Sequence, residues 1–136
     1  MAERLAVLGF AALAGLVLYA VYLLWRRAGA EPLERLDVDE LGLELMAGCC
    51  AFVVFTSPGC RPCAAALSVV GRAAERSPNE VEVTAVDALE RPELTRRYDV
   101  RTVPTVFLIT ASGHVLARWK SVPDPAAVHA ALELTR

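Results

Sequence analysis

Two cysteines three positions apart are the residues of this chain best suited to chemistry. They belong to the segment Cys60-Arg61-Pro62-Cys63, which follows an apolar run and opens a stretch with helical periodicity. Across a first helical turn this spacing brings two sulfur atoms close enough for a disulfide. Unpaired N–H groups at the helix N-terminus, with Arg61 nearby, stabilise a thiolate on Cys60. Pro62 stiffens the turn without losing a hydrogen bond, and Cys63 is expected to be the more buried, resolving cysteine.

Structural zinc is the alternative use of such a pair. Zinc needs two further ligands, and the other cysteines of the chain are Cys49 and Cys50. An intervening strand at about 3.3 Å per residue separates the two pairs by roughly 15–20 Å, which exceeds the span of one zinc site. Cys49 and Cys50 are therefore interpreted as small, buried apolar residues. We expect a redox-active pair at Cys60 and Cys63, with no metal and no organic cofactor.

A second motif, Thr102-Val103-Pro104-Thr105, comes directly before an apolar run. Proline cannot donate to a sheet ladder, so its place at the first residue of a strand is permitted and informative. An ordinary turn proline is the alternative. His114, His129 and Trp119 are not expected near the cysteine pair; Trp119 is interpreted as a packing residue of an edge strand.

The pattern of apolar residues predicts an α/β fold. Helices are expected over Asp37–Met46, Cys63–Arg76 and Arg91–Tyr98 and from Pro125 onward, and strands over Cys50–Phe55, Val81–Val86, Thr105–Ile109 and Val115–Lys120. Asp124 is the expected N-cap of the last helix. This order predicts a mixed four-stranded sheet flanked by helices, with a parallel crossover first and an antiparallel hairpin last.

Composition restricts the class of protein. The chain has 136 residues, enough for one domain of ordinary size, and 55% of them are hydrophobic. A formal net charge of −2 argues against nucleic acid as a partner, because phosphate binding requires a clustered basic surface. Four cysteines are too few for a disulfide-stapled scaffold.

The apolar excess lies at the N-terminus. Leu5–Trp25 contains no charged residue, and as a helix it would span roughly 31 Å, close to the thickness of a bilayer core. A single transmembrane anchor is expected; a cleaved signal peptide and a buried helix are the alternatives. Arg26 and Arg27 follow the run, against Arg4 before it, so the positive-inside rule favours a cytoplasmic C-terminal domain. The predicted division is an anchor at 1–27, a short connector at 28–36 and a catalytic domain at 37–136.

Four segments together resemble the thioredoxin family. They are FTSPGCRPC at 55–63, Asp87 at the end of a strand, TVPT at 102–105 and ASGHV at 111–115, in family order over about residues 37–134. With its apolar N-terminus, the whole chain resembles membrane-anchored thioredoxin-like proteins of bacteria.

The resemblance implies a role for each site residue. Cys60 would attack a substrate disulfide and Cys63 would resolve the mixed disulfide, while Val103 and cis-Pro104 would offer main-chain hydrogen bonds to the substrate. Expected partners are protein or small disulfide substrates, an electron donor that the sequence does not identify, and the membrane.

Three positions depart from the family pattern. Gly59 replaces the usual tryptophan before the first cysteine, Val54 replaces a buried acid, and Val83 replaces the lysine that partners it. Without that acid, proton transfer at Cys63 must use water or substrate. The expected function is a membrane-anchored thiol–disulfide oxidoreductase that reduces or exchanges protein disulfides. The alternatives are an outward-facing reductase for disulfide isomerisation or cytochrome maturation, and a non-catalytic membrane scaffold.

Overall fold

A computed structural model of the chain describes residues 13–21 and 35–135. The chain divides into two compact units, Met1–Pro32 and Leu33–Arg136. The predicted division at residues 27 and 36 remains a prediction.

Within the first unit, residues 13–21 form a helix in which every residue is exposed. The rest of the predicted membrane span, Leu5–Trp25, lies outside the described residues. In the part of the chain that the structure describes, no helix has both the length and the apolar character needed to cross a bilayer. The anchor and its orientation therefore remain predictions.

The second unit is built on one mixed sheet of four strands, β1 (Cys50–Thr56), β2 (Val81–Asp87), β3 (Thr105–Thr110) and β4 (Val115–Trp119). The spatial order is β2-β1-β3-β4, with β1 parallel to β2 and antiparallel to β3, and with β3 antiparallel to β4. The parallel crossover and the terminal hairpin are both confirmed. Every residue of β1 except Thr56 is buried, as expected for a central strand covered on both faces.

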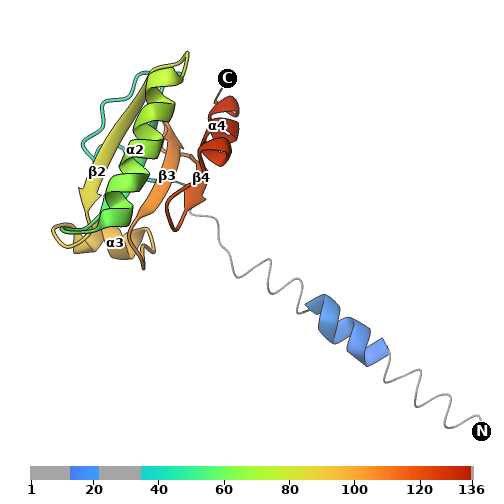
Figure 1. Cartoon of the computed structure of the whole chain (residues 1–136). Helices are drawn as coiled ribbons and strands as arrows, with labels where there is room; N and C mark the ends of the chain where they lie inside the picture. Colours follow the sequence, from blue (N-terminus) through green and yellow to red (C-terminus); the bar gives the residue numbers. More distant parts are fainter. Residues whose placement is uncertain (1–12, 22–34, 136) are drawn as a thin grey trace, which may run out of the picture. The chain divides into compact units, whose positions relative to one another are not determined.

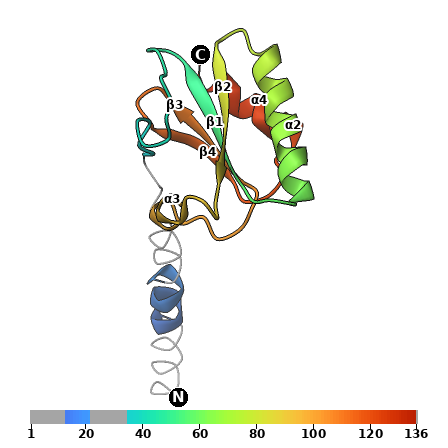
Figure 2. The same ribbon diagram turned by 90° about the vertical axis from the view of Figure 1, so that its left-hand side faces the viewer.

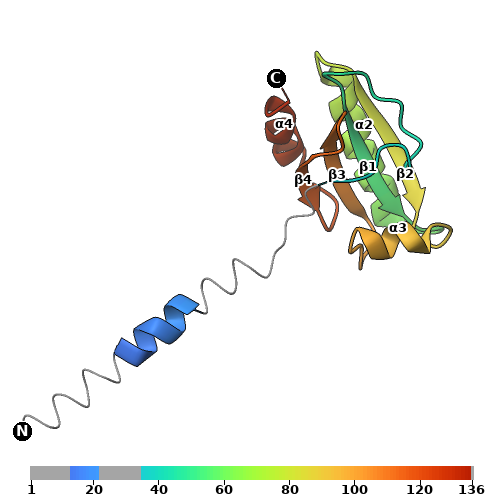
Figure 3. The same ribbon diagram turned by 180° about the vertical axis from the view of Figure 1, so that it is seen from behind.

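Helices and one long segment cover the two faces of the sheet. α2 (Arg61–Arg76) and α4 (Pro125–Glu133) lie on one face, and α3 (Pro92–Arg97) lies near one end of the sheet (Figures 1 and 2). The segment at 35–49 crosses the opposite face, as Figure 3 shows from behind. Phe52 and Val54 pack with α2 and α4, whereas Val53 and Phe55 pack with α3 and the 35–49 segment. This alternation follows from the two-residue period of a strand.

The predicted helix over Asp37–Met46 is wrong, because the chain there makes a single turn. Oδ1 of Asp37 accepts the N–H groups of Asp39 and Glu40 at 3.1 and 3.2 Å, which starts a helical turn. Gly42, at φ +69°, then ends it: its N–H donates to Asp39 O, and Leu43 N–H donates to Val38 O at 3.0 Å. These two bonds are those of a Schellman helix stop. Met46, expected to face inward, is 69% exposed.

The ends of two elements differ from expectation in detail. Leu36, at the end of the predicted connector, is buried, and its N–H donates to Gly113 O at 2.8 Å. Asp124 occupies the N-cap position of α4, but its side chain makes no capping hydrogen bond. The residues of α4 that face the core are Val128, Ala131 and Leu132, all buried.

Candidate active site

The cysteine pair lies where β1 meets α2. β1 ends at Thr56, a short loop follows, and α2 begins at Arg61. Gly59, at φ +73°, turns the chain, and the Cys60 N–H donates to Ser57 O at 3.3 Å. The site thus stands beyond the C-terminal edge of the central strand, on a loop held at both ends by regular structure.

Cys60 and Cys63 are joined by a disulfide, with their Cα atoms 5.3 Å apart. Cys60 is the N-cap residue of α2 and is half-buried, whereas Cys63 is 3% exposed. The Cys63 N–H donates to the Cys60 Sγ at 3.2 Å. One sulfur therefore combines accessibility with a backbone donor, and the other is covered.

The charge around the first turn of α2 is favourable to an anion. Arg61 and Pro62 are both exposed in that turn, which contains no acidic residue. The N-terminus of α2 and the charge of Arg61, the residue after Cys60, therefore both favour an anion at this position, with no carboxylate of the same turn to oppose them.

The second motif comes to the same edge of the sheet. Phe55 of β1 pairs with Thr105 of β3, so Val103 and Pro104 stand beside the point where β1 runs into the cysteine loop. The Val103–Pro104 peptide bond is cis, as the resemblance implied; Pro104 is buried and Val103 is half-buried. The Thr105 hydroxyl donates to Thr102 O at 2.6 Å, which closes the loop before β3.

Val54 is fully buried in β1, between Ala85 of β2 and Val106 of β3. Its side chain packs with residues on the inner face of α2, among them Ala66 and Val70. Cys63 lies one turn before Ala66 on this face, and the side chain that this part of β1 presents to α2 is a hydrocarbon. Val83 packs in the same cluster and supplies no cation.

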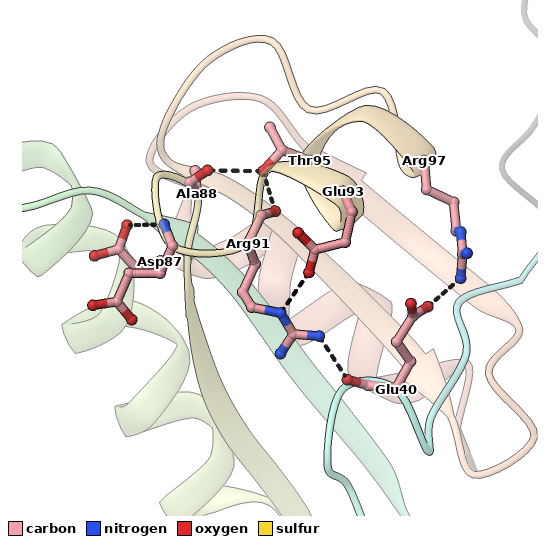
Figure 4. Close-up of polar contacts among 8 residues, drawn as sticks. Glu40, Asp87, Ala88, Arg91, Glu93, Thr95 and Arg97 are labelled. Atoms are coloured by element: carbon pink, nitrogen blue, oxygen red, sulfur yellow. Dashed lines mark hydrogen bonds and ion pairs between the residues drawn. The ribbon is translucent and has the colours of Figure 1, made fainter.

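Asp87 ends β2 next to Thr56 and stabilises the following turn rather than reaching the sulfurs. Its Oδ1 accepts the Leu89 N–H at 2.8 Å. Further along, Arg91 donates from Nη2 to the main-chain oxygen of Glu40, and Arg97 forms an ion pair with the Glu40 carboxylate (Figure 4).

The sequence pattern did not predict this connection between the 35–49 segment and α3, because it indicated a helix over Asp37–Met46 with local contacts only. The matching signal is the basic run at 91–101, which carries arginines at 91, 96, 97 and 101.

The other cysteines lie at the opposite end of β1. Cys50 is 1% exposed, and burial raises the pKa of its thiol; a hydrogen bond with the Thr135 side chain opposes this shift and the neighbouring Cys49 adds to it. Cys49 is half-buried, with its Sγ 3.8 Å from a carboxylate oxygen of Glu80. Among the described residues, no three His, Cys, Asp or Glu side chains are grouped so as to hold a metal ion.

The histidines and Trp119 have structural contacts elsewhere. His114 Nε2 lies 3.1 Å from Arg35 Nη2, and His129 Nε2 lies 3.7 Å from a Glu133 carboxylate oxygen. Trp119, on the edge strand β4, packs against Phe52 with ring centroids 6.5 Å apart.

Known proteins match this chain over the region that contains the site. The family model named Thioredoxin matches residues 45–129. The thioredoxin of Methanocaldococcus jannaschii is 38% identical over 55 residues, 40% of this chain and 65% of that protein. Thioredoxin 1 of Synechococcus elongatus is 32% identical over 56 residues, 41% and 52% of the two chains. These matches span less than two thirds of either relative.

Solved structures agree with this assignment. A mutant thioredoxin from Halobacterium salinarum superposes with a TM-score of 0.56 at 27% identity, covering 63% of this chain and 74% of its own. Thioredoxin-2 of the malaria parasite, described as a component of the protein secretion machinery, gives a TM-score of 0.59 at 17% identity, covering 68% and 88%. The latter likeness concerns the fold alone. With a family model matched over most of its folded unit and a Cys60–Cys63 pair at the start of α2, the chain belongs to the thioredoxin family.

Proposed function

We propose that the chain is a thiol–disulfide oxidoreductase that reduces or exchanges disulfides of protein substrates. The observation that carries this proposal is the asymmetry of the Cys60–Cys63 pair. Cys60 is partly accessible at the N-terminus of α2, with the Cys63 N–H 3.2 Å from its sulfur, whereas Cys63 is nearly inaccessible. This is the arrangement that a sequential attack by two thiols requires.

In the first step, the Cys60 thiolate attacks one sulfur of a substrate disulfide. A bond forms from Cys60 to that sulfur, the substrate S–S bond breaks, and the departing thiolate takes up a proton. In the second step, Cys63 loses its proton and attacks the Cys60 sulfur, which releases the second substrate thiolate. The net result is a reduced substrate, an oxidised Cys60–Cys63 pair, and two electrons and two protons transferred. A thiol-type reductant must then restore the dithiol.

The protein assists the first step electrostatically. The Cys63 N–H donates to the Cys60 sulfur, which lies at the N-terminus of α2, and Arg61 adds a positive charge. Thiolate character on Cys60 raises the fraction of this residue that is in the reactive form for the first step.

Substrate recognition is assigned to the main chain at Val103 and Pro104. An extended substrate segment beside the cysteine loop would find there a backbone that is not paired within the sheet, because β3 begins at Thr105. Proline at 104 has no N–H, so the main-chain donor of this pair is the Val103 N–H, whereas both residues have a carbonyl oxygen that can accept.

The second step lacks a protein carboxyl at the position where the family pattern has one, since Val54 is fully buried there. Cys63 therefore passes its proton to water or to the departing substrate thiolate. This makes resolution of the mixed disulfide the slower step, and it favours a narrow set of substrates that dock long enough for it.

Membrane attachment through Leu5–Trp25, with the catalytic unit on the cytoplasmic side, is also part of the proposal. Its support is the uncharged length of that segment and the Arg26–Arg27 pair that follows it. Labelling of the thiols with a membrane-impermeant maleimide, in intact and in permeabilised cells, tests the orientation. Efficient labelling of Cys60 in intact cells would reverse it.

Cysteine variants of the full chain test the chemistry. We expect Cys60→Ser to abolish dithiothreitol-dependent reduction of insulin and Cys63→Ser to accumulate a mixed disulfide with substrate. Cys49→Ser, which changes a thiol outside the site, is the matched control and should retain activity. A wild-type chain without reductase activity, together with a Cys63→Ser variant that captures no substrate, would favour the scaffold alternative.

A further inference from the structure

A groove on the outer side of the helical layer is separate from the dithiol. It lies between α2 and α4, which are side by side on the same face of the sheet (Figures 1 and 2). Its volume is about 420 Å³, within the usual range of small-molecule sites. The α2 side begins at Val69, nine residues after Cys60, which corresponds to about 13 Å along a helix. A ligand in this groove would leave Cys60 accessible.

The floor of this α2–α4 groove is apolar. Val69 and Ala73 of α2 are half-buried, Leu132 of α4 is 7% exposed, and all three pack with the core beneath the helices. Part of their surface nevertheless faces the groove. A hydrocarbon chain laid along this floor would remove apolar surface from water on both partners, which is the main source of affinity in such sites.

The α2 wall of the groove carries two guanidinium groups. Arg72 and Arg76 are exposed and one turn apart, so both stand on the same side of the helix. Arg72 donates to the neutral Ser68 hydroxyl at 3.1 Å, and Arg76 has no polar partner among the described residues. Neither positive charge is balanced by a carboxylate bonded to it.

The α4 wall carries a carboxylate, that of Glu133, instead of guanidinium groups. His129 and Glu133 face each other there, with Nε2 and a carboxylate oxygen 3.7 Å apart. This contact is an ion pair only when the histidine is protonated. The groove lining carries the charges of Arg72 and Arg76 against that of Glu133, so its net charge is positive and lies on the α2 side, where a planar guanidinium can bind an oxyanion with two parallel hydrogen bonds.

The walls favour an acyl chain over a peptide. The lining residues at 69–76 and 125–133 belong to helices, whose main-chain N–H and C=O groups are bonded largely within each helix, and those at 77–79 belong to the loop after α2. An extended peptide in the groove would lose water from its own N–H and C=O groups without finding backbone partners, at a cost for every buried group. An aliphatic chain has no such groups.

We propose that the α2–α4 groove binds a medium-chain carboxylate, with its hydrocarbon chain on Val69, Ala73 and Leu132 and its carboxylate on Arg72 and Arg76. The site is independent of the Cys60–Cys63 pair. It therefore gives the chain a second binding function beyond disulfide chemistry.

The test is photolabelling of the full chain with an octanoate analogue that carries a diazirine in its hydrocarbon chain, followed by mapping of the labelled residues. We expect labels within 69–79 and 125–133 that plain octanoate displaces. Octyltrimethylammonium, with the same chain and the opposite charge, and acetate, with the head group alone, should not displace them. Residue-level mapping separates these labels from any within the apolar helix at 13–21.

Variants make the test specific. Replacing both Arg72 and Arg76 by Gln should weaken labelling of the groove about tenfold or more, the usual effect of losing charge-assisted hydrogen bonds. Arg96→Gln, an exposed arginine on α3, is the matched control. Ala73→Trp should block the floor, whereas Ala127→Trp, on an exposed position of α4, should not. Retained insulin reduction reports that each variant is folded.

Three results would overturn the proposal. The first is labelling that misses the groove. The second is labelling that the double arginine variant leaves unchanged, and the third is labelling that octyltrimethylammonium displaces as well as octanoate does. In the last two cases the groove would be an unselective apolar surface. A Cys60→Ser chain should be labelled like the wild type, so failure here is distinguishable from failure of the redox proposal.

Discussion

Two pairs of cysteines lie at opposite ends of β1, and the protein treats them differently. At the C-terminal end, Cys60 and Cys63 open α2 and form a disulfide, with one sulfur accessible. At the N-terminal end, Cys50 enters the core and Cys49 is half-buried beside Glu80. Each pair is preceded by a glycine with positive φ, Gly59 and Gly48 respectively. The residue types and the local turns are thus similar, whereas one pair leads into a helix and the other into a strand.

The difference shows that the element after the cysteines determines their chemistry. A helix N-terminus offers unpaired N–H groups to a sulfur anion, whereas a strand uses its N–H groups in the ladder. In a helix, residues three apart share a face, so two sulfurs can meet; in a strand, adjacent residues point to opposite faces. Cys49 and Cys50 are therefore kept apart by the same sheet that positions Cys60.

The largest expected difference between the two pairs is in the rate at which their thiols are alkylated. In the reduced chain, iodoacetamide should modify Cys60 at least about a hundredfold faster than Cys50, because Cys50 must first be exposed by an opening that costs about 2.7 kcal/mol or more. The measurement is the rate of modification of each cysteine, followed by mass spectrometry. Comparable rates for the two thiols would mean that the end of β1 opens readily and that its burial does not protect it.

The buried thiol of Cys50 should also make the free energy of unfolding depend on pH. Burial raises the pKa of the Cys50 thiol above its ordinary value of 9.0. The unfolded chain then loses this proton before the folded chain does, so the contribution of Cys50 to stability is complete below about pH 9 and is lost as the pH rises through the folded value. Unfolding by urea between pH 8 and 10 should show this loss in the wild type and not in Cys50→Ala.

The next effect concerns Val54, which lies on β1 between the two pairs. Val54→Asp should lower the free energy of unfolding by about 1–3 kcal/mol or more, because the buried carboxyl has no designed partner and Val83 provides no cation. Desolvation should raise the pKa of the new carboxyl, so that it can accept the Cys63 proton near neutral pH. We therefore expect a less stable variant whose Cys60 mixed disulfide resolves faster.

Single-turnover decay of the mixed disulfide at several pH values, in both proteins, measures this effect. Val53→Asp is the matched control, since Val53 is equally buried but faces the α3 side of the sheet. The Val53→Asp variant should be less stable than the wild type, and its Cys60 mixed disulfide should not resolve faster. An unchanged rate and an unchanged melting temperature in Val54→Asp would contradict the position of Val54 beneath the site.

The strand and loop around Cys60 and the loop around Pro104 differ in how well the sequence predicts them. The strand Cys50–Phe55 and the cysteine loop were predictable, because a continuous apolar run, a Pro-Gly break and a helical period are local signals. Periodicity alone does not relate Pro104 to Cys60. That relation came from the family resemblance, and in the structure it depends on the pairing of Phe55 with Thr105.

The 35–49 segment was predicted wrongly, and its contacts show why. Its apolar spacing fits a helix, but the turn that begins at Asp37 is stopped at Gly42, and Leu41 and Leu43 are buried on either side of that stop. The contacts that hold the segment are tertiary: Glu40 is bound by Arg91 and Arg97, some fifty residues away. A pattern search over one stretch of chain does not detect such a partner.

The glycines before each pair provide a smaller, matched test. Ala at position 48 or 59 meets no atom within 4 Å, so the cost is conformational only, about 1–2 kcal/mol of unfolding free energy for a positive φ. We expect Gly48→Ala and Gly59→Ala to be destabilised alike in urea. Insulin reduction should fall severalfold in Gly59→Ala alone, because only that loop positions Cys60. Equal activity in both variants would mean that the loop geometry does not limit the reaction.

The smallest effect is expected at Cys49. Its side chain is half-buried and its one polar contact is the long one to Glu80, at 3.8 Å, so Cys49→Ser should change the free energy of unfolding by less than about 0.5 kcal/mol. Cys50→Ser, the neighbouring change, buries a hydroxyl at a site that is 1% exposed and should cost about 1–3 kcal/mol. Urea unfolding of the two variants measures the difference, and both should reduce insulin at the wild-type rate. A Cys49→Ser variant as unstable as Cys50→Ser would mean that both thiols belong to the core, and a loss of activity in either would give this end of β1 a part in the redox chemistry.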